Sequence, residues 1–228
     1  MKTLGLIGGT SWHSTIEYYR LINSLVSEKI GSKYNPPLLM YSLNVALMRE
    51  GHTEKIKQAY LDISKNLSNA GADAILICAN TPHLVYDFVQ PQLDIPILHI
   101  ADAIAKEANA KGLKNLGLLG TMPTMTQGFL QKRIAEQSDI KVIIPEESHL
   151  TMTHDLIANE LTQGNFSAQA KTFYINQMQL LKNRGADGII LGCTELPMLL
   201  DDKDFSLPML NTTFLHAQMA RDFILSDL

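Results

Sequence analysis

Apolar and polar positions along the first half of the chain follow two periods in turn. Short apolar runs, which have the length of buried strands, occupy residues 4–9, 37–43, 74–78 and 95–99. Segments with apolar side chains at three- and four-residue steps, which predict helices, occupy residues 15–30, 55–70 and 101–110. Strands that alternate with helices in this way predict the α/β class, with a mainly parallel sheet covered by helices.

The same order of segments returns in the second half of the chain. The matched landmarks are KTLGLIG from Lys2 with KNLGLLG from Lys114, Gly71-Ala-Asp with Gly185-Ala-Asp, Cys78 with Cys193, and Ile95-Pro96 with Leu207-Pro208. Their common order and nearly constant spacing indicate two halves of similar fold, related by a pseudo-twofold axis. The alternative explanation is the general similarity of all βα units.

We therefore expect two pseudo-symmetric lobes, each a mainly parallel sheet flanked by helices. Residues 1–100 and 211–228 form the first expected lobe, with the C-terminal helix crossing back to it, and residues 101–210 form the second. Ligands of open α/β sheets bind outside the carboxyl ends of the strands. The active site is accordingly expected in the cleft between the lobes.

Composition and charge narrow the classes of function. The 228 residues are 46% hydrophobic and 18% charged, as in ordinary globular proteins, and the formal net charge is −4. Such a charge provides no basic field for nucleic acid or an anionic membrane, and no apolar segment approaches the roughly 20 residues of a membrane span. The apolar run at the start of the chain is too short for the core of a signal peptide, so we expect a cytoplasmic protein.

Both cysteines of the chain, Cys78 and Cys193, come at the end of an apolar run. Five interpretations of the two thiols are open: core residues, a disulfide, metal ligands, a redox pair or catalytic groups. Thiols normally stay reduced in the cytoplasm, and no Cys-x-x-Cys or histidine spacing indicates zinc. The glycine-rich start, GLIGGTSW, lacks the spacing of a dinucleotide or phosphate loop, so we expect neither a cofactor nor a metal.

Matched thiols at two strand ends favour acid–base chemistry. A thiolate on one face of an amino acid removes the α-proton, and a thiol on the opposite face supplies a new one, which inverts the carbon. The thiolate needs stabilisation, which we expect from backbone N–H groups and helix N-termini after the strands.

Four segments are similar to one known family. They are MKTLGLIGGTSWHSTIEYY at the start, ICANTPH around Cys78, LLGTMPTM at 118–125 and GADGIILGCTEL around Cys193. Together they resemble the aspartate/glutamate racemase family, and most closely its aspartate racemase and broad-specificity amino-acid racemase branch. The resemblance covers essentially the whole chain, and it implies two α/β lobes, no pyridoxal phosphate, no metal and a homodimer.

The resemblance also implies roles for individual residues. Cys78 and Cys193 would be the two acid/base residues, with Cys193 taking the proton from the L substrate and Cys78 from the D substrate. The implied substrate-binding residues are Thr10, Ser11, Ala79, Asn80, Thr81, Thr121, Thr124, Thr194 and Glu195. His83, which follows closely after Cys78, is expected to orient a neighbour or cap a helix.

Recognition of the substrate side chain is less well defined. Some aspartate racemases hold the distal carboxylate with an arginine after the second strand and with a lysine before a glycine in the second lobe. Arg49 is the candidate for the first group, with a solvated loop residue as the alternative. Gly164 is preceded by Thr162-Gln163 rather than by lysine, and Lys171 lies farther along the chain.

The leading hypothesis is cofactor-independent racemisation of an acidic amino acid, aspartate first and glutamate second. The alternatives are racemisation of another amino acid or a related carbon acid such as a hydantoin, a catalytically silent amino-acid-binding module, and a thiol redox protein. A small-molecule substrate is expected in each enzymatic case.

Overall fold

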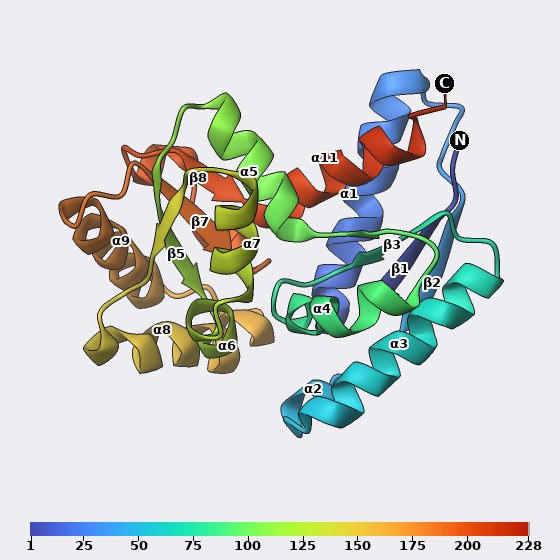
Figure 1. Ribbon diagram of the computed structural model, residues 1–228. Helices are drawn as coiled ribbons and strands as arrows, with labels where there is room; N and C mark the ends of the chain where they lie inside the picture. Colours follow the sequence, from blue (N-terminus) through green and yellow to red (C-terminus); the bar gives the residue numbers. More distant parts are fainter. Residues whose placement is uncertain (228) are drawn as a thin grey trace. The chain divides into compact units, whose positions relative to one another are not determined.

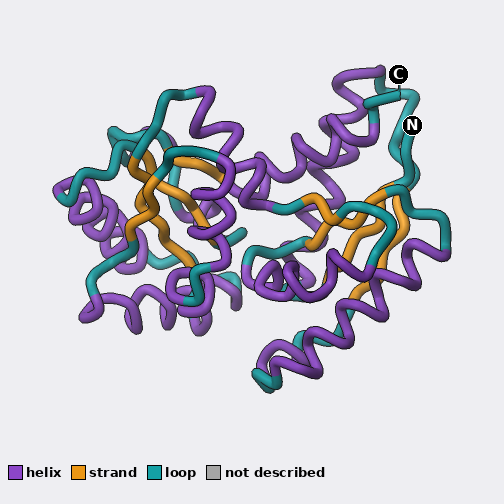
Figure 2. Tube along the Cα trace, viewed as in Figure 1, coloured by secondary structure: helices purple, strands orange, loops and turns teal. Residues whose placement is uncertain are grey.

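The computed structural model describes residues 1–227 and shows two compact α/β units (Figures 1 and 2). The first unit contains Met1–His99 and the chain from His216 onward, and the second contains Ile100–Leu215. No helix in the described part of the chain is long and apolar enough to cross a membrane.

Each unit is built on a parallel four-stranded sheet. The first sheet has the order β2-β1-β3-β4, with bounds Leu38–Ser42, Leu4–Gly8, Ala74–Ile77 and Ile97–Leu98. The second has the order β6-β5-β7-β8, with bounds Lys141–Ile143, Asn115–Gly120, Gly188–Gly192 and Met209–Asn211. The strand orders are the same once the second set is numbered from its own start. The predicted α/β class and the parallel sheets are confirmed.

The helices of the first unit follow its strands. They are α1 (Trp12–Ile30), α2 (Ala46–Arg49), α3 (Thr53–Asn69), the 3₁₀ helix η1 (Thr81–Val85), α4 (Tyr86–Val89) and η2 (Gln90–Gln92). The helices of the second are α5 (Ile100–Ala110), α6 (Met122–Thr126), α7 (Phe129–Gln137), α8 (Glu147–Asn159), η3 (Leu161–Gln163), α9 (Ala168–Asn183), α10 (Leu196–Leu199) and η4 (Asp202–Asp204). The last helix, α11 (Thr212–Ile224), begins in the second unit and ends in the first.

Two element boundaries differ from the sequence prediction for identifiable reasons. Helix α1 starts at Trp12 rather than residue 15, because the Ser11 hydroxyl caps it by accepting a bond from the Ser14 amide. Strand β4 covers only two of the five predicted residues. Pro96 has no amide proton to donate to a ladder, although its carbonyl still accepts a bond from Ile75.

The first sheet buries both of its faces. Leu4, Leu6 and Leu76 belong to one apolar cluster with residues of α1 and α11, and Ile75 and Ile77 belong to another with residues of α3. This division follows from the two-residue period of a strand, which sends successive side chains to opposite faces. Burial on both faces also explains why the strands are continuous apolar runs rather than alternating ones.

Candidate active site

Cys78 is the first residue after β3. Its side chain is fully buried in the cluster that also contains Leu76 and Ala217. Its amide donates to the Ile7 carbonyl at 2.9 Å, and its carbonyl accepts a 2.5 Å bond from the Ser14 hydroxyl. Burial raises the pKa of the Cys78 thiol, because a thiolate without water is costly.

The segment after Cys78 turns sharply into η1. Ala79 and Asn80 are buried, Thr81 is half-buried and opens η1, and Pro82 occupies the first turn, where its missing amide proton matters least. His83 binds back to this segment, with Nδ1 at 2.9 Å from the Ala79 carbonyl and 3.2 Å from that of Asn80. These contacts connect the His83 ring to the two residues that follow Cys78.

Two other predicted residues lie in the loop between β1 and α1. Thr10 has a buried hydroxyl oxygen beside the Tyr60 hydroxyl, and Ser11 caps α1. Thr15, one turn into α1, receives the Gly9 amide on its hydroxyl at 2.8 Å and donates to the Ser11 carbonyl at 2.9 Å. These bonds hold the loop close to the end of β1.

Arg49 lies at the end of the four-residue helix α2, and its side chain is exposed. It makes no ion pair or hydrogen bond with any residue that the structure describes. Lys171, on α9, binds Asp204 with 2.6 Å between Nζ and Oδ2. The ammonium of Lys171 is thus already engaged by a carboxylate of its own unit.

Cys193 follows β7 as Cys78 follows β3. Its side chain is 9% exposed, and its Sγ donates to Glu195 Oε2 at 2.9 Å. The Thr194 hydroxyl donates to the same carboxylate oxygen at 2.7 Å. Burial, followed by the negative charge of Glu195 and its acceptance of the thiol proton, raises the pKa of Cys193 well above its ordinary value.

Thr121 and Thr124 follow β5 in the same unit. Their hydroxyl oxygens are 3.0 Å apart, Thr121 precedes α6 and Thr124 is fully buried. A Cβ on Gly120 would come within 3.1 Å of both the Thr124 methyl and the Gly192 carbonyl. The glycine at the end of β5 therefore allows Thr124 to pack against the ends of two neighbouring strands.

The environment of the thiols differs from the expected one. Stabilisation of a thiolate by helix N-termini was expected, but the elements after the cysteines are the five-residue η1 and the four-residue α10. Helices this short have small dipoles, and burial dominates in both places. Both cysteines are free thiols, and the structure favours their protonated forms.

Two buried tyrosines that were not predicted from the sequence lie near the thiols. Tyr60 on α3 is fully buried, its pKa is raised chiefly by that burial, and its hydroxyl is close to Thr10 and within electrostatic range of Cys78. Tyr174 on α9 is also fully buried, its pKa is raised chiefly by that burial, and its hydroxyl is within electrostatic range of Cys193. The signal was available, because both tyrosines lie on the helix that precedes a repeated Gly-Ala-Asp.

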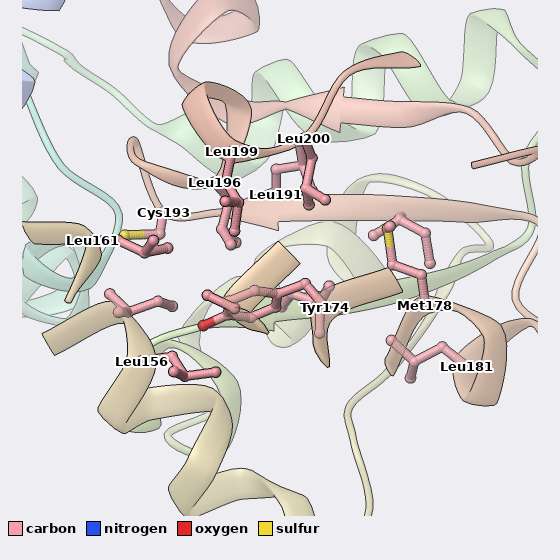
Figure 3. Close-up of a cluster of buried hydrophobic side chains, with 14 of the residues drawn as sticks. Leu156, Leu161, Tyr174, Met178, Leu181, Leu191, Cys193, Leu196, Leu199 and Leu200 are labelled. Carbon is pink, nitrogen blue, oxygen red and sulfur yellow. The ribbon is translucent and has the colours of Figure 1, made fainter. Parts of the chain in front are cut away.

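Figure 3 shows the surroundings of Cys193, with its sulfur at the edge of an apolar cluster beside Leu161. The hydroxyl of Tyr174 points toward the helix that carries Leu156, which agrees with its 2.7 Å bond to the Thr153 carbonyl. Among the described residues, no group of three or more His, Cys, Asp or Glu side chains is arranged to hold a metal ion.

Comparisons with known proteins agree with this arrangement. The chain is 24% identical to the broad specificity amino-acid racemase RacX of Bacillus subtilis over 215 residues, which cover 92% of each protein. A solved structure of a putative Asp/Glu racemase from Yersinia pestis is 38% identical, with a TM-score of 0.92 over 99% of this chain and 100% of that one. An aspartate racemase homologue from Pyrococcus horikoshii is 32% identical, with a TM-score of 0.86 over 98% and 99%.

A family model described as Asp/Glu/hydantoin racemase matches residues 7–220, nearly the whole chain. That span includes both thiols, the loop after β1 and the repeated strand ends described above. The chain therefore belongs to the Asp/Glu/hydantoin racemase family of isomerases, which characteristically work without pyridoxal phosphate.

Proposed function

We propose that the protein racemises an acidic amino acid, aspartate first and glutamate second, by moving a proton between its α-carbon and the thiols of Cys78 and Cys193. The observation that carries this proposal is the position of the two thiols. Each is buried directly after the equivalent strand of a sheet, and the two sheets have the same strand order. Equivalent positions suit a reaction that must run equally well in both directions.

The proposed reaction balances with one thiolate and one thiol. A thiolate takes the α-hydrogen as a proton, and its electron pair stays on the substrate, where it is delocalised into the carboxylate. The opposite thiol then gives its proton to the other face of the carbon. The product is the mirror-image amino acid, and the thiol and thiolate have exchanged places. Following the family, we assign the proton of the L substrate to Cys193 and that of the D substrate to Cys78.

Glu195 supports this chemistry by its contact with the Cys193 thiol. Burial keeps the Cys193 thiol protonated. A base must therefore accept the thiol proton before the Cys193 thiolate can remove a proton from the α-carbon of the substrate. Glu195 Oε2 already accepts the hydrogen bond of that thiol, so we propose that it takes the proton when substrate binds.

The remaining polar residues are proposed to bind the amino-acid backbone. Thr10 offers a buried hydroxyl, and Asn80 and Thr81 lie two and three residues after Cys78. Thr121, Thr124 and Thr194 carry hydroxyls near the strand ends of the second unit. Such groups hold a carboxylate as charge develops on it.

A second candidate is a racemase of broader or less acidic specificity. Lys171 is engaged by Asp204, which weakens the case for a second cation at a distal carboxylate, and Arg49 is the residue we propose for that role. The similarity to RacX, a broad specificity amino-acid racemase by name, favours the same alternative. A hydantoin or another carbon acid remains within the family description.

The test is proton NMR in heavy water, with reducing agent and no added cofactor. We expect loss of the α-proton signal of L-Asp or D-Asp together with inversion, and loss of activity in Cys78→Ser and in Cys193→Ser. Serine is a far weaker acid than cysteine, so each substitution removes one proton carrier and keeps the size of the side chain similar.

Activity that survives either substitution would overturn the two-thiol mechanism. Exchange with a neutral amino acid or a hydantoin instead of Asp and Glu would favour the second candidate. Tight binding of amino acids without exchange would indicate a silent binding module. We also propose a cytoplasmic homodimer, and light scattering after size-exclusion chromatography would measure the mass of the assembly.

A further inference from the structure

Three histidines are packed together inside the first unit. His83 lies on η1, His99 follows β4, and His216 lies on α11; none is more than 2% exposed. The ring centroid of His83 lies 4.6 Å from that of His99 and 5.5 Å from that of His216. Buried imidazoles are uncommon unless their nitrogen atoms are engaged.

His83 directs one nitrogen at the segment that carries Cys78. The partners of Nδ1 are the Ala79 and Asn80 carbonyls, at 2.9 and 3.2 Å. Carbonyl oxygens only accept hydrogen bonds, so Nδ1 carries the proton and is the donor to both. With the Ser14 hydroxyl bound to the Cys78 carbonyl, three consecutive carbonyls after β3 are held by buried side-chain donors.

His216 packs against the ring of His83 in an edge-to-face contact. Its Nε2 lies 2.8 Å from the Leu98 carbonyl and its Nδ1 lies 2.9 Å from the Tyr18 hydroxyl. Nε2 must therefore donate to the Leu98 carbonyl, and Nδ1 can accept from the Tyr18 hydroxyl, which is the arrangement of a neutral ring. Burial, with the nearby His83, lowers the pKa of His216 to about 3, in agreement with these bonds. His83 thus packs against an uncharged ring of fixed orientation.

We propose that His83 is a positioning residue for Cys78: its Nδ1–H clamps the carbonyls of residues 79 and 80 and so sets the direction of the thiol and of the Asn80 side chain. The proposal rests on the proposed function, in which Cys78 exchanges a proton with the substrate. Proton transfer to carbon requires close alignment, and a displacement of about 1 Å costs on the order of 100-fold in rate.

The experiment compares His83→Asn with His83→Leu. The side-chain nitrogen of asparagine lies where histidine has Nδ1, so His83→Asn keeps the clamp, whereas His83→Leu fills the space without a donor. We expect kcat/KM to fall by about 100-fold in His83→Leu and by only a few-fold in His83→Asn. Equal losses in the two variants would overturn the proposal.

His83→Gln is a second variant in case His83→Leu does not fold. Its amide reaches toward the Nε2 position, away from the two carbonyls, and we expect it to behave like His83→Leu. A substrate deuterated at the α-carbon adds a readout that general destabilisation does not move. We expect the isotope effect to rise for one enantiomer only, the one deprotonated by Cys78, and an equal rise for both would contradict the proposal.

Alkylation of the two thiols by iodoacetamide separates this proposal from the proposed function. Without substrate, peptide mass spectrometry measures the rates at Cys78 and Cys193 in each variant. We expect faster alkylation of Cys78 relative to Cys193 in His83→Leu and His83→Gln, and the wild-type ratio in His83→Asn. An unchanged ratio in all variants would refute the clamp, whereas a wild-type protein that fails to racemise any amino acid would refute the proposed function alone.

Discussion

At the scale of single residues, the two thiols have different surroundings. Cys78 is surrounded by apolar side chains, and its pKa is raised by burial. Cys193 is also buried, but its proton is held by Glu195. The two buried tyrosines differ as well, because Tyr174 donates to a backbone carbonyl whereas the Tyr60 hydroxyl lies beside that of Thr10. Similar strand ends therefore provide two unequal sites for a proton.

Replacement of Glu195 by glutamine should make the Cys193 thiol react faster with an alkylating agent and should make racemisation slower. The amide still accepts a hydrogen bond from the thiol but carries no charge, so the pKa of Cys193 should fall toward the value that burial alone sets. Alkylation of Cys193 at neutral pH should therefore become faster. Racemisation should nevertheless fall by at least about 100-fold, because the proposed base is lost.

Cys78 is the internal control for this measurement, since Glu195 is not among the causes of its raised pKa. The measurement is the pH dependence of alkylation at both thiols by peptide mass spectrometry. Both rates are measured without substrate, and slower alkylation of Cys193 in Glu195→Gln would show that the carboxylate does not raise the pKa of the thiol in the free protein.

At the scale of elements, the repeated Gly-Ala-Asp has a structural role. Asp187 accepts the amides of Lys114 and Asn115 at 2.7 and 2.9 Å, and Asp73 accepts that of Thr3 at 2.6 Å. Each aspartate thus fixes the start of the neighbouring strand. The glycine two residues earlier has positive φ in both copies, which ends the preceding helix and starts the turn into the strand.

Replacement of Gly192 by alanine should disturb the end of β7. A Cβ there would come within 2.8 Å of the Leu119 carbonyl and 2.9 Å of a Leu118 methyl, so the strand must shift. We expect a loss of about 1–3 kcal/mol in the free energy of unfolding, measured by urea denaturation. Activity should fall with it, because Cys193 is the next residue.

Gly112→Ala provides the comparison, because its Cβ meets no atom within 4 Å and only the positive φ of +70° opposes it. We expect a smaller loss of stability there and activity close to wild type. Equal effects at the two glycines would contradict the steric explanation for Gly192.

At the scale of the whole molecule, α11 returns the chain to the first unit and brings His216 into its core. Ala217, Ala220 and Ile224 pack there with Leu4 and Tyr18. A neutral histidine in this place links folding to pH, since the unfolded chain binds a proton near pH 6.5 and the folded chain only near pH 3.

The free energy of unfolding should therefore fall as the pH is lowered from about 6.5 toward 3, by up to about 1.4 kcal/mol per pH unit from this one group. The contribution is fully present above the unfolded-state pKa and is lost below it. Urea denaturation at pH 7 and at pH 5.5 measures the effect. His216→Gln, which keeps a donor toward Leu98 but does not titrate, should show a smaller difference between the two pH values; an unchanged difference would exclude His216 as the cause.

The sequence by itself determined the α/β class, the parallel strands and the membership of a racemase family. These features follow from local periodicity and from short motifs around Cys78 and Cys193, so they can be derived without knowledge of long-range contacts. Helix and strand ends were less accurate, as Ser11 and Pro96 show, because an end depends on one capping bond or one missing donor.

Only the tertiary structure decided the state of the thiols. Burial raises both pKa values, where the motifs had indicated helix N-termini that lower them. The three-histidine cluster also emerged only in three dimensions, since His83 and His216 lie far apart in the chain and meet only after folding. The physical reason is that desolvation and hydrogen bonding depend on which distant residues exclude water from a group, and local sequence does not encode that contact.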